Sequence, residues 1–510
     1  MQTPVLIVGA GPTGLVLALW LTKRGIPCRI IDRNPGPGLR SRAMVVQART
    51  LEFYRQLGIA EKVVEQGIKA KIIHLMEKGR EVAQLQFGDI GQGISPYPYA
   101  LSFPQDDHEK LLGVQLSKLG VRVEWDTELL HLEDQGDVVR AELNSEQIEA
   151  QFVCGCDGAR STIRSELGLG FPGGTYDSVF FVADVEAPSQ TVGEDGFNMC
   201  LGDRGFILAF PIRSSGSFRL IGLLPDELRS EPDVTFADLN SFVQETVGVE
   251  TTAVHWFSTY HVHHRVADHF RVGRVFLAGD AGHIHSPAGG QGMNTGIGDA
   301  VNLAWKLAHV IRGGNPDIFG SYESERLAFA RALVATTDRA FQLIVGKDFT
   351  SRMARELIPH LAPFVLGFTP VRRAAFGLVS QTKINYHDSS LSQGAVGNLR
   401  GGDRLPWVES LDNFASLASL DWQVHAYGTA SEEVKNVAHE IGVRNIDFPW
   451  TDDAEAAGFE REAIYLVRPD GYIGFCGKHG DLSALRSYAS EYLLATDSES
   501  PDAKPIAPTE

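Results

Sequence analysis

The first thirty residues constrain the fold more than any other stretch of this chain. A short β-branched run at residues 4–9 (PVLIVG) is typical of a strand buried on both faces, and it runs into the turn Gly9-Ala10-Gly11-Pro12-Thr13-Gly14. An apolar helical stretch over residues 15–22 follows, and then a second strand over residues 26–31 that ends at Asp32. This order of strand, glycine-rich turn, helix, strand and acid indicates a dinucleotide-binding unit of the doubly wound α/β type.

Each part of this turn has a physical role in such a unit. Gly9 permits the tight turn, Gly11 lets the backbone approach a pyrophosphate, and Gly14 lets the helix pack closely on the strand. The N-terminus of the helix that follows this turn offers unpaired N–H groups and a partial positive charge to phosphates. Asp32 can accept hydrogen bonds from a ribose diol. The alternative is a glycine-rich turn that holds no ligand.

A local excess of basic side chains surrounds the end of this unit. The whole chain is acidic, with 46 Lys and Arg against 64 Asp and Glu and a formal net charge of −18, which argues against nucleic acid or an anionic membrane surface as a partner. Residues 23–55, however, contain eight basic and only two acidic side chains, and this local positive charge indicates an anionic ligand. Arg42 and Arg49 lie where a loop runs into a helix, and Arg33 follows Asp32 directly. Any one of these arginines could equally be a solvated surface residue.

Two later strands also end in an acidic residue next to glycine. Residues 152–156 (FVCGC) are typical of a buried strand and lead into Asp157-Gly158. Residues 274–278 form a similar strand that leads into Gly279-Asp280. At the end of a strand, Asp280 is suited to bind a ribityl or ribose hydroxyl.

The segment after Asp280 predicts a site for a flat ring. Residues 287–294 contain three glycines, so their backbone N–H groups can approach a ring closely. A helix with apolar residues at 3.6-residue spacing is expected over residues 298–312. Its start would place the positive end of a helix dipole beside a ring carbonyl.

These three motifs, in this order and spacing, resemble those of the class A flavoprotein monooxygenases, the p-hydroxybenzoate and phenol hydroxylase family. The resemblance covers residues 3–330 and is closest to polyketide aromatic hydroxylases, 3-(3-hydroxyphenyl)propionate hydroxylases and rifampicin monooxygenases. It implies that the first turn and Asp32 bind the ADP half of FAD, that Asp157 lies in a motif linked to FAD and NAD(P)H, and that Gly279-Asp280 holds the ribityl chain. Gln105 resembles a glutamine that touches the ribityl region. The residues we expect to bind the cofactor are Gly9, Gly11, Pro12, Gly14, Asp32, Arg33, Arg42, Gln105, Asp157, Gly279, Asp280, Pro287, Gly290, Gly292, Met293 and Asn294.

The expected fold is α/β, with a Rossmann-like FAD-binding domain, an inserted β-sheet substrate domain and a C-terminal thioredoxin-like α/β domain. The FAD-binding domain is predicted to be discontinuous, at residues 1–175 and 268–335. Strand-like alternation marks the substrate domain at residues 176–267. A helical connection is expected at residues 336–394, and residues 496–510 are predicted to be a disordered tail because they are rich in proline and acid.

The C-terminal domain is predicted at residues 395–492. The segment Arg468-Pro469-Asp470-Gly471-Tyr472 resembles part of the thioredoxin-like domain of phenol and polyketide hydroxylases. It has no CxxC motif and Cys476 stands alone, so a thiol–disulfide role is excluded. We expect the domain to support dimer contacts or to cover the flank of the enzyme.

The resemblance implies an FAD-dependent, NAD(P)H-consuming monooxygenase that hydroxylates a phenolic or polycyclic aromatic substrate with O2, through a C4a-hydroperoxyflavin. FAD would be bound non-covalently, and the electron donor would be NADPH or NADH. Such a reaction needs partial ionisation of a phenol whose pKa is near 10, a deficit of about 4 kcal/mol at pH 7. A neighbouring arginine or a general base can close much of that gap. Arg213 and His261, on the expected substrate sheet, are the candidate catalytic residues.

Several alternatives stay open from the sequence. An epoxidase or a Baeyer–Villiger oxygenase could use the same scaffold, and a non-enzymatic FAD-binding protein is a further reading. No metal site is expected, because the histidines between residues 261 and 285 lack carboxylate or cysteine partners at matching spacing. Five cysteines make no disulfide framework, and the apolar N-terminus is broken by glycines, so a cytoplasmic protein without a membrane anchor is expected. A homodimer is compatible with the sequence.

Overall fold

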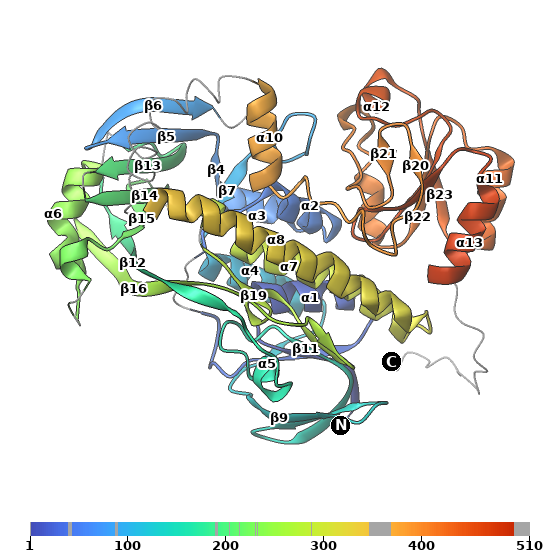
Figure 1. Ribbon diagram of the computed structural model, residues 1–510, viewed down its shortest axis with the longest axis horizontal. Helices are drawn as coiled ribbons and strands as arrows, with labels where there is room; N and C mark the ends of the chain where they lie inside the picture. Colours follow the sequence, from blue (N-terminus) through green and yellow to red (C-terminus); the bar gives the residue numbers. More distant parts are fainter. Residues whose placement is uncertain are drawn as a thin grey trace.

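The computed structural model describes residues 2–38, 43–86, 90–188, 192–202, 204–213, 215–229, 231, 233–286, 288–345 and 369–493. These residues form three α/β parts that lie one after another along the long axis of the molecule (Figure 1). The predicted tail at residues 496–510 lies outside the described residues. Among the described residues, no helix combines the length and the hydrophobicity that a bilayer crossing requires.

A mostly parallel sheet carries the N-terminal part of the chain (Figure 1). Its strands, in spatial order, are β17 (Arg271–Val272), β18 (Val275–Leu277), β11 (Gln147–Gly155), β1 (Gln2–Val8), β2 (Cys28–Ile31) and β8 (Val123–Glu124). The hairpin of β9 (Leu129–Asp134) and β10 (Val139–Leu143) extends β11. Strand β1 pairs in parallel with both β2 and β11, and β11 pairs in parallel with β18. The side chains from Val5 to Ile7 are fully buried, as the apolar run predicts for a strand covered on both faces.

Long apolar helices cover this sheet. Helix α1 (Pro12–Lys23) packs against α4 (Gln105–Lys118) and α7 (Gly292–Ile311), and α7 packs in turn against α8 (Phe319–Val345). Nearly every residue of α7 between Asn294 and Ala308 is buried. The expected helix over residues 298–312 is therefore present, but it starts six residues earlier, at Gly292. The short helix α5 (Thr162–Glu166) follows β11.

A second, large mixed sheet lies beyond the first. Its strands, in spatial order, are β19 (His283–Ile284), β16 (Ala253–Val266), β12 (Gly173–Glu186), β15 (Ser217–Leu223), β14 (Gly205–Pro211), β13 (Gly196–Gly202), β5 (Ile72–Glu77) and β6 (Arg80–Gln86). Strands β5 and β6 come from residues 72–86, outside the range 176–267 that the sequence predicts for this sheet. They join it because β5 pairs in parallel with β13, a contact across more than 120 residues that no local pattern reveals.

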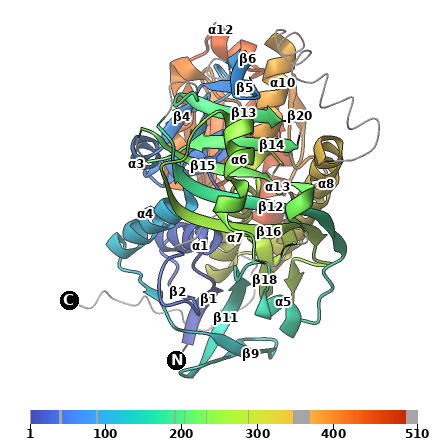
Figure 2. The same cartoon turned by 90° about the vertical axis from the view of Figure 1, so that its left-hand side faces the viewer.

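The two faces of this second sheet have different partners. Helix α6 (Phe236–Val247) covers one face, where Phe181, Ala183 and Val185 pack against it (Figure 2). The opposite face, which we call the inner face, carries Phe180, Val182, Phe210, Ile221 and Val262. The inner face packs against a small sheet of β3 (Val45–Val46), β7 (Ala100–Ser102) and β4 (Ile68–Ala70), whose residues continue the same apolar cluster.

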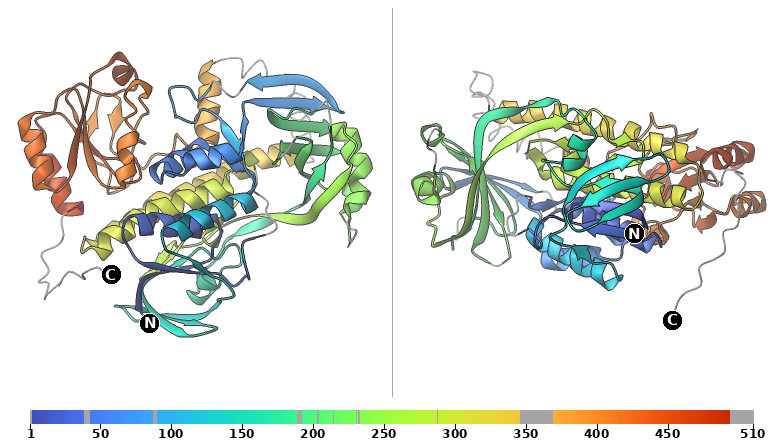
Figure 3. Two further views of the ribbon diagram at one scale, coloured as in Figure 1. Left: turned by 180° about the vertical axis from the view of Figure 1, so that it is seen from behind. Right: turned by 90° about the horizontal axis from the view of Figure 1, so that it is seen from below.

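The C-terminal part contains its own sheet, at the end of the molecule opposite α6 (Figures 1 and 3). Its strands, in spatial order, are β23 (Arg444–Phe448), β22 (Gln423–Tyr427), β24 (Ile464–Val467) and β25 (Ile473–Gly477). Only the β22–β23 pair is parallel. The helices of this part are α11 (Glu432–Glu440), α12 (Asp452–Ala456) and α13 (Leu482–Tyr492). The small hairpin of β20 (Ala395–Val396) and β21 (Leu399–Arg400) precedes them.

Three further α-helices lie in the described chain. Helix α2 (Ala48–Gln56) follows β3, and α3 (Ala60–Gln66) follows α2. Helix α10 (Thr369–Val379) leads toward the C-terminal part. Helix α2 contacts both α7, where Thr50 donates to Asn294 at 2.8 Å, and the C-terminal part, where Arg55 donates to Asp412.

Candidate cofactor and substrate site

Four strand ends meet at one edge of the first sheet. Because β2, β1, β11 and β18 are neighbouring parallel strands, their carboxyl ends line the same edge. In spatial order this edge carries Asp32, the turn from Gly9 to Gly14, Asp157 and Gly279-Asp280. The structure thus brings together three motifs that lie more than 100 residues apart in the sequence.

The glycines of the first turn fit a bound pyrophosphate. Gly9 has a φ of +105°, and a Cβ there would collide with the carbonyl of Cys156, while a Cβ at Gly14 would collide with the carbonyl of Gly9. Gly11 is different, because among the described residues no atom lies within 4 Å of an ideal Cβ at this position. The protein itself therefore needs glycine at the first and third positions. The open space beside Gly11, at the start of α1, leaves room for a phosphate to approach the backbone.

The first turn also contacts the later motifs. An ideal Cβ at Gly279 would lie 2.6 Å from Oγ1 of Thr13, and a Cβ at Gly296 would collide with the same oxygen. Residues from the start of α1, the end of β18 and the second turn of α7 therefore pack on one another without room for side chains. A single extended ligand could contact all three segments.

Asp32 lies at the edge of the sheet with its carboxylate held in place. It accepts hydrogen bonds from the backbone N–H of Ala10 at 2.8 Å and of Asn34 at 2.9 Å. The neighbouring Arg33 is half-exposed, and its guanidinium lies 4.0 Å from Glu128. Arg42 lies outside the described residues, as does Pro287.

Asp157 accepts a hydrogen bond from the first turn of the short helix α5, whose N-cap is Ser161, and one of its oxygens has no partner among the described residues. Its Oδ2 accepts the backbone N–H of Ile163 at 3.2 Å. Its Oδ1 is buried and, within the described part of the chain, has no hydrogen-bond partner. Burial raises the pKa of this carboxyl, against the opposing effect of its hydrogen bonds to Ser161 and Ile163. A buried, unpartnered oxygen at the edge of the sheet is consistent with a ligand that donates a hydrogen bond there.

A buried network behind the Gly279-Asp280 turn escaped the sequence analysis. Asp299 of α7 accepts the backbone N–H of Gly279 at 3.0 Å, lies 2.8 Å from Nε2 of His283, and accepts Nε–H of Arg326 at 2.6 Å. Burial alone would raise the pKa of Asp299, but Arg326 and His283 hold it below its usual value. The signal was present in the sequence, because Asp299 and Lys306 are the only Asp, Glu, Lys or Arg residues in the apolar stretch 292–311. The side chain of Asp280 itself is exposed at the edge.

The segment before α7 lies against β3. An ideal Cβ at Gly290 would lie 3.0 Å from Cβ of Val45, and α7 begins at Gly292, next to the half-buried Met293. The side chain of Asn294 is buried and belongs to the scaffold. Its oxygen accepts the N–H of Gln47 at 2.9 Å and its amide donates to the carbonyl of Val45 at 2.8 Å. Asn294 thus fixes β3 to the start of α7.

Gln105 begins α4 and is half-buried. Its amide donates to Glu109 at 2.8 Å, and Glu109 also accepts the N–H of Gly38 at 3.2 Å. Burial raises the pKa of Glu109. Gln105 therefore lies near the segment that follows Asp32, with its side chain bonded within α4.

The inner face carries a row of side chains from neighbouring strands. Trp256, Asp184, Arg219 and Phe210 lie directly opposite one another across β16, β12, β15 and β14. Arg219 and Asp184 form a buried, two-bond ion pair at 2.6 and 2.7 Å. The indole Nε1 of Trp256 is buried and has no hydrogen-bond partner within the described residues. This face contacts Val45 and so lies next to the segment before α7.

Arg213, one of the two expected catalytic residues, lies at the rim of the inner face. Its guanidinium donates to Asp107 at 2.7 Å and to Asp106 at 2.5 Å, and it lies 3.6 Å from Asp184. Burial by itself lowers the pKa of Arg213, but these carboxylates raise it overall. The charge of Arg213 is therefore already compensated, which the sequence could not reveal.

His261, the other expected catalytic residue, lies on the opposite face of the sheet. It is directly across from Val179, whose side chain packs against the α6-covered face, whereas its neighbours Tyr260 and Val262 belong to the inner face. Successive side chains of a strand alternate between faces, so His261 points away from the inner face and is exposed. This geometry does not support His261 as the general base.

Known proteins are similar to this chain in sequence and in fold. The family model described as an FAD binding domain matches residues 2–337. The 6-methylpretetramide 4-monooxygenase of Streptomyces rimosus is 30% identical over 98% of this chain and 95% of its own length, and the pentachlorophenol 4-monooxygenase of Sphingobium chlorophenolicum is 32% identical over 79% and 76%. The solved structure of OxyS anhydrotetracycline hydroxylase from Streptomyces rimosus is similar with a TM-score of 0.76 at 27% identity, covering 97% of this chain and 99% of that one.

Proposed function

Because this chain belongs to the FAD-binding-domain family of flavoprotein aromatic monooxygenases, we propose that its substrate is a neutral, planar, polycyclic phenol. The protein is an FAD-dependent monooxygenase that uses NAD(P)H and O2. FAD supplies the oxygen-activating redox chemistry when it is bound. The residues of this chain bind and orient the substrate, exclude water from it and hold the proton of its hydroxyl group.

The shape of the inner face supports a planar substrate. Aromatic side chains dominate this face and its surroundings, and flat rings stack well against such side chains. The residues are Tyr176, Phe180, Phe197, Phe206, Phe210, Trp256 and Tyr260. Most of them are only partly buried, so apolar surface remains for a ligand with several fused rings to cover.

The charges on this face support a neutral substrate, and this is the observation that carries the proposal. A substrate carboxylate is bound best by an arginine whose charge is not yet compensated. Both arginines described on this face, Arg213 and Arg219, are paired with Asp106, Asp107 or Asp184. A carboxylate substrate would add a fourth negative charge to three carboxylates and two guanidinium groups.

We propose that Asp106 and Arg213 orient the hydroxyl group of the phenol. Asp106 Oδ1 is buried without a hydrogen-bond partner in the described part of the chain, and Arg219 lies 4.0 Å from it. An oxygen without a donor is suited to accept the hydrogen bond of a phenol and then to take its proton as a general base, which leaves the substrate as a phenolate. Once Asp106 holds this proton, the guanidinium of Arg213 loses one compensating charge and would stabilise the phenolate, while the total charge of the site stays the same.

The test compares matched compounds with the purified, FAD-loaded protein. Naphthol and the corresponding hydroxynaphthoate share a ring system and differ by one carboxylate. We expect naphthol to stimulate NAD(P)H oxidation at least about tenfold more in kcat/KM, which corresponds to about 1.4 kcal/mol of unfavourable charge. Mass spectrometry should find one added oxygen atom in the product. A preference for the carboxylate would refute the neutral-substrate proposal.

We also infer that the C-terminal part is a thioredoxin-like domain. Its strand order β23-β22-β24-β25, its parallel first pair and its helices α11 and α13 support this assignment. Cys476 is buried, and burial raises its pKa to about 11, so it is not a reactive thiol. The cytoplasmic location and the homodimer stay predictions from the sequence, and gel filtration of the purified protein tests the second.

A further inference from the structure

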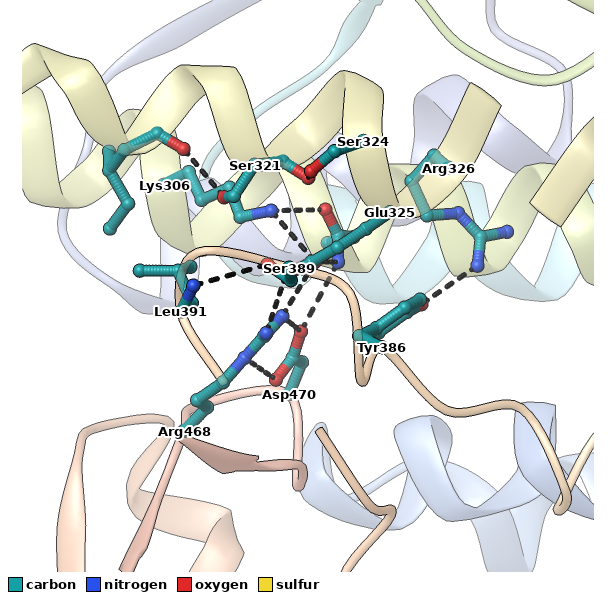
Figure 4. A network of polar contacts seen from close by, with 12 residues as sticks. Lys306, Ser321, Ser324, Glu325, Arg326, Tyr386, Ser389, Leu391, Arg468 and Asp470 are labelled. Atoms are coloured by element: carbon teal, nitrogen blue, oxygen red, sulfur yellow. Dashed lines mark hydrogen bonds and ion pairs between the residues drawn. The ribbon is translucent and has the colours of Figure 1, made fainter. Parts of the chain in front are cut away.

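One turn of the C-terminal part reaches into the FAD-binding part. Residues 468–471 connect β24 to β25, and Figure 4 shows Arg468 and Asp470 of this turn pointing toward Glu325 and Lys306 on α8 and α7. Arg468 donates to both oxygens of Glu325, at 2.7 and 2.9 Å. Asp470 accepts Nε1–H of Trp305 on α7 at 3.0 Å. The turn therefore binds α7 and α8 at the same time.

The charges at this contact are fully enclosed. The side chains of Lys306, Glu325 and Arg468 are 0% exposed and that of Asp470 is 2% exposed. Glu325 also accepts a hydrogen bond from Nζ of Lys306 at 2.9 Å. Burial lowers the pKa of Lys306 to about 8, against the opposing effect of Glu325. Apolar residues of similar volume often give equal or greater stability than such buried charges, so adhesion between domains does not by itself explain the cluster.

The cluster continues without a break to the cofactor site. Arg326, the residue after Glu325, donates to Asp299 at 2.6 Å, and Asp299 holds the backbone N–H of Gly279. Arg326 also donates to the hydroxyl of Tyr386 at 2.9 Å, and the guanidinium of Arg468 lies 5.3 Å from the ring centroid of Tyr386. Arg468 therefore contacts both Glu325 and the tyrosine that supports Arg326.

We propose that the turn from Arg468 to Asp470 is a positioning element of the FAD site. By joining α7 to α8, it fixes the pair Asp299–Arg326, and this pair fixes the turn at Gly279-Asp280 that is suited to hold the ribityl chain. The inference rests on FAD binding by the family and does not depend on the substrate proposed above. It gives the C-terminal domain a role in cofactor binding.

The test uses the full-length apoprotein with two variants and a matched control. Arg468→Gln removes the contact to Glu325, and Glu325→Gln removes one charge while keeping the shape. Phe459→Leu is the control, because Phe459 is 3% exposed in the core of the C-terminal domain and stacks on Tyr427, away from the turn. FAD affinity is measured by fluorescence quenching. Hydrogen exchange of the apoprotein reports on the amide of Gly279.

We expect Arg468→Gln to weaken FAD binding about tenfold or more and Glu325→Gln to weaken it severalfold, with faster exchange at Gly279 in both. Phe459→Leu should lower the melting temperature but change FAD affinity and Gly279 exchange less than about twofold. If Arg468→Gln does not fold, the FAD affinity and the Gly279 exchange of Glu325→Gln test the proposal. Unchanged FAD affinity and exchange in folded Glu325→Gln would overturn the proposal, as would an equal loss of affinity in the control. Failure of the unmodified chain to bind FAD would instead refute its function as a flavoenzyme.

Discussion

The open space beside Gly11 leads to a prediction that separates cofactor binding from folding. Gly11→Ala adds one methyl group where no described protein atom lies within 4 Å. The residue has φ −70° and ψ −178°, an extended conformation that alanine also adopts. Gly14→Ala is the matched variant in the same turn, because its methyl group would collide with the carbonyl of Gly9.

The expected magnitudes follow from this packing. Alanine restricts the unfolded chain more than glycine does, which stabilises the folded Gly11→Ala protein by about 0.4–1 kcal/mol. Alanine is also a poorer N-cap residue than glycine, which destabilises it by a similar amount. The free energy of unfolding of the apoprotein should therefore change by less than about 1 kcal/mol. The methyl group would keep a phosphate from the backbone N–H groups, and losing one such charged hydrogen bond costs about 1.5–3 kcal/mol, or about 10- to 150-fold in the Kd of FAD. Gly14→Ala should destabilise the apoprotein itself by about 1–3 kcal/mol.

Urea unfolding of the apoproteins and titration with FAD measure the two quantities separately. Gly11→Ala should unfold like the unmodified chain and bind FAD weakly, whereas Gly14→Ala should unfold earlier. A Gly11→Ala protein that binds FAD with unchanged affinity would show that the pyrophosphate does not approach this turn.

Three further predictions concern buried charges and the sheet faces. Asp184→Asn removes the carboxylate that accepts two hydrogen bonds from the fully buried Arg219, so denaturant titration should show a free energy of unfolding lower by about 3–5 kcal/mol, and a decrease below about 1 kcal/mol would contradict the buried pair. Burial lowers the pKa of His108 and His425 to about 3, whereas an unfolded histidine titrates near 6.5. The unfolded chain therefore binds more protons as the pH falls below 6.5, and at pH 5 each histidine should lower the unfolding free energy by about 2 kcal/mol; His425→Gln should reduce the measured pH dependence by that amount. Because His261 points away from the inner face, His261→Ala should keep the pH profile of substrate hydroxylation between about pH 6 and 9, and an altered profile would restore it as a candidate base.

Local patterns predicted the parts of the site that depend on backbone shape. The glycine spacing from Gly9 to Gly14 and the acids after buried strands predicted glycine turns and acids at strand ends, which the structure places at the carboxyl edge of the first sheet. These parts were predictable because a strand, a turn and a helix that follow one another directly in the chain can form only a few local structures. Roles assigned to individual side chains were harder to predict. Asn294 stands inside the expected motif, yet its side chain bonds to β3 and α2. The spacing of a motif fixes where a residue lies but does not reveal which neighbours its side chain meets.

The sequence by itself determined that three separate strands end in glycine turns and acids suited to a dinucleotide, since a buried strand and the turn that follows it are encoded by neighbouring residues. The tertiary structure decided that these strands are neighbours whose ends share one edge. Only the tertiary structure decided which charged side chains are already paired with a side chain of opposite charge. Arg213 meets Asp106, Asp107 and Asp184, and Arg326 meets Asp299. The turn at residues 468–471 meets two helices that lie more than 140 residues earlier in the chain. The physical reason is that the energy of a charge depends on its burial and its partners, and both are set by contacts between segments that the sequence keeps far apart.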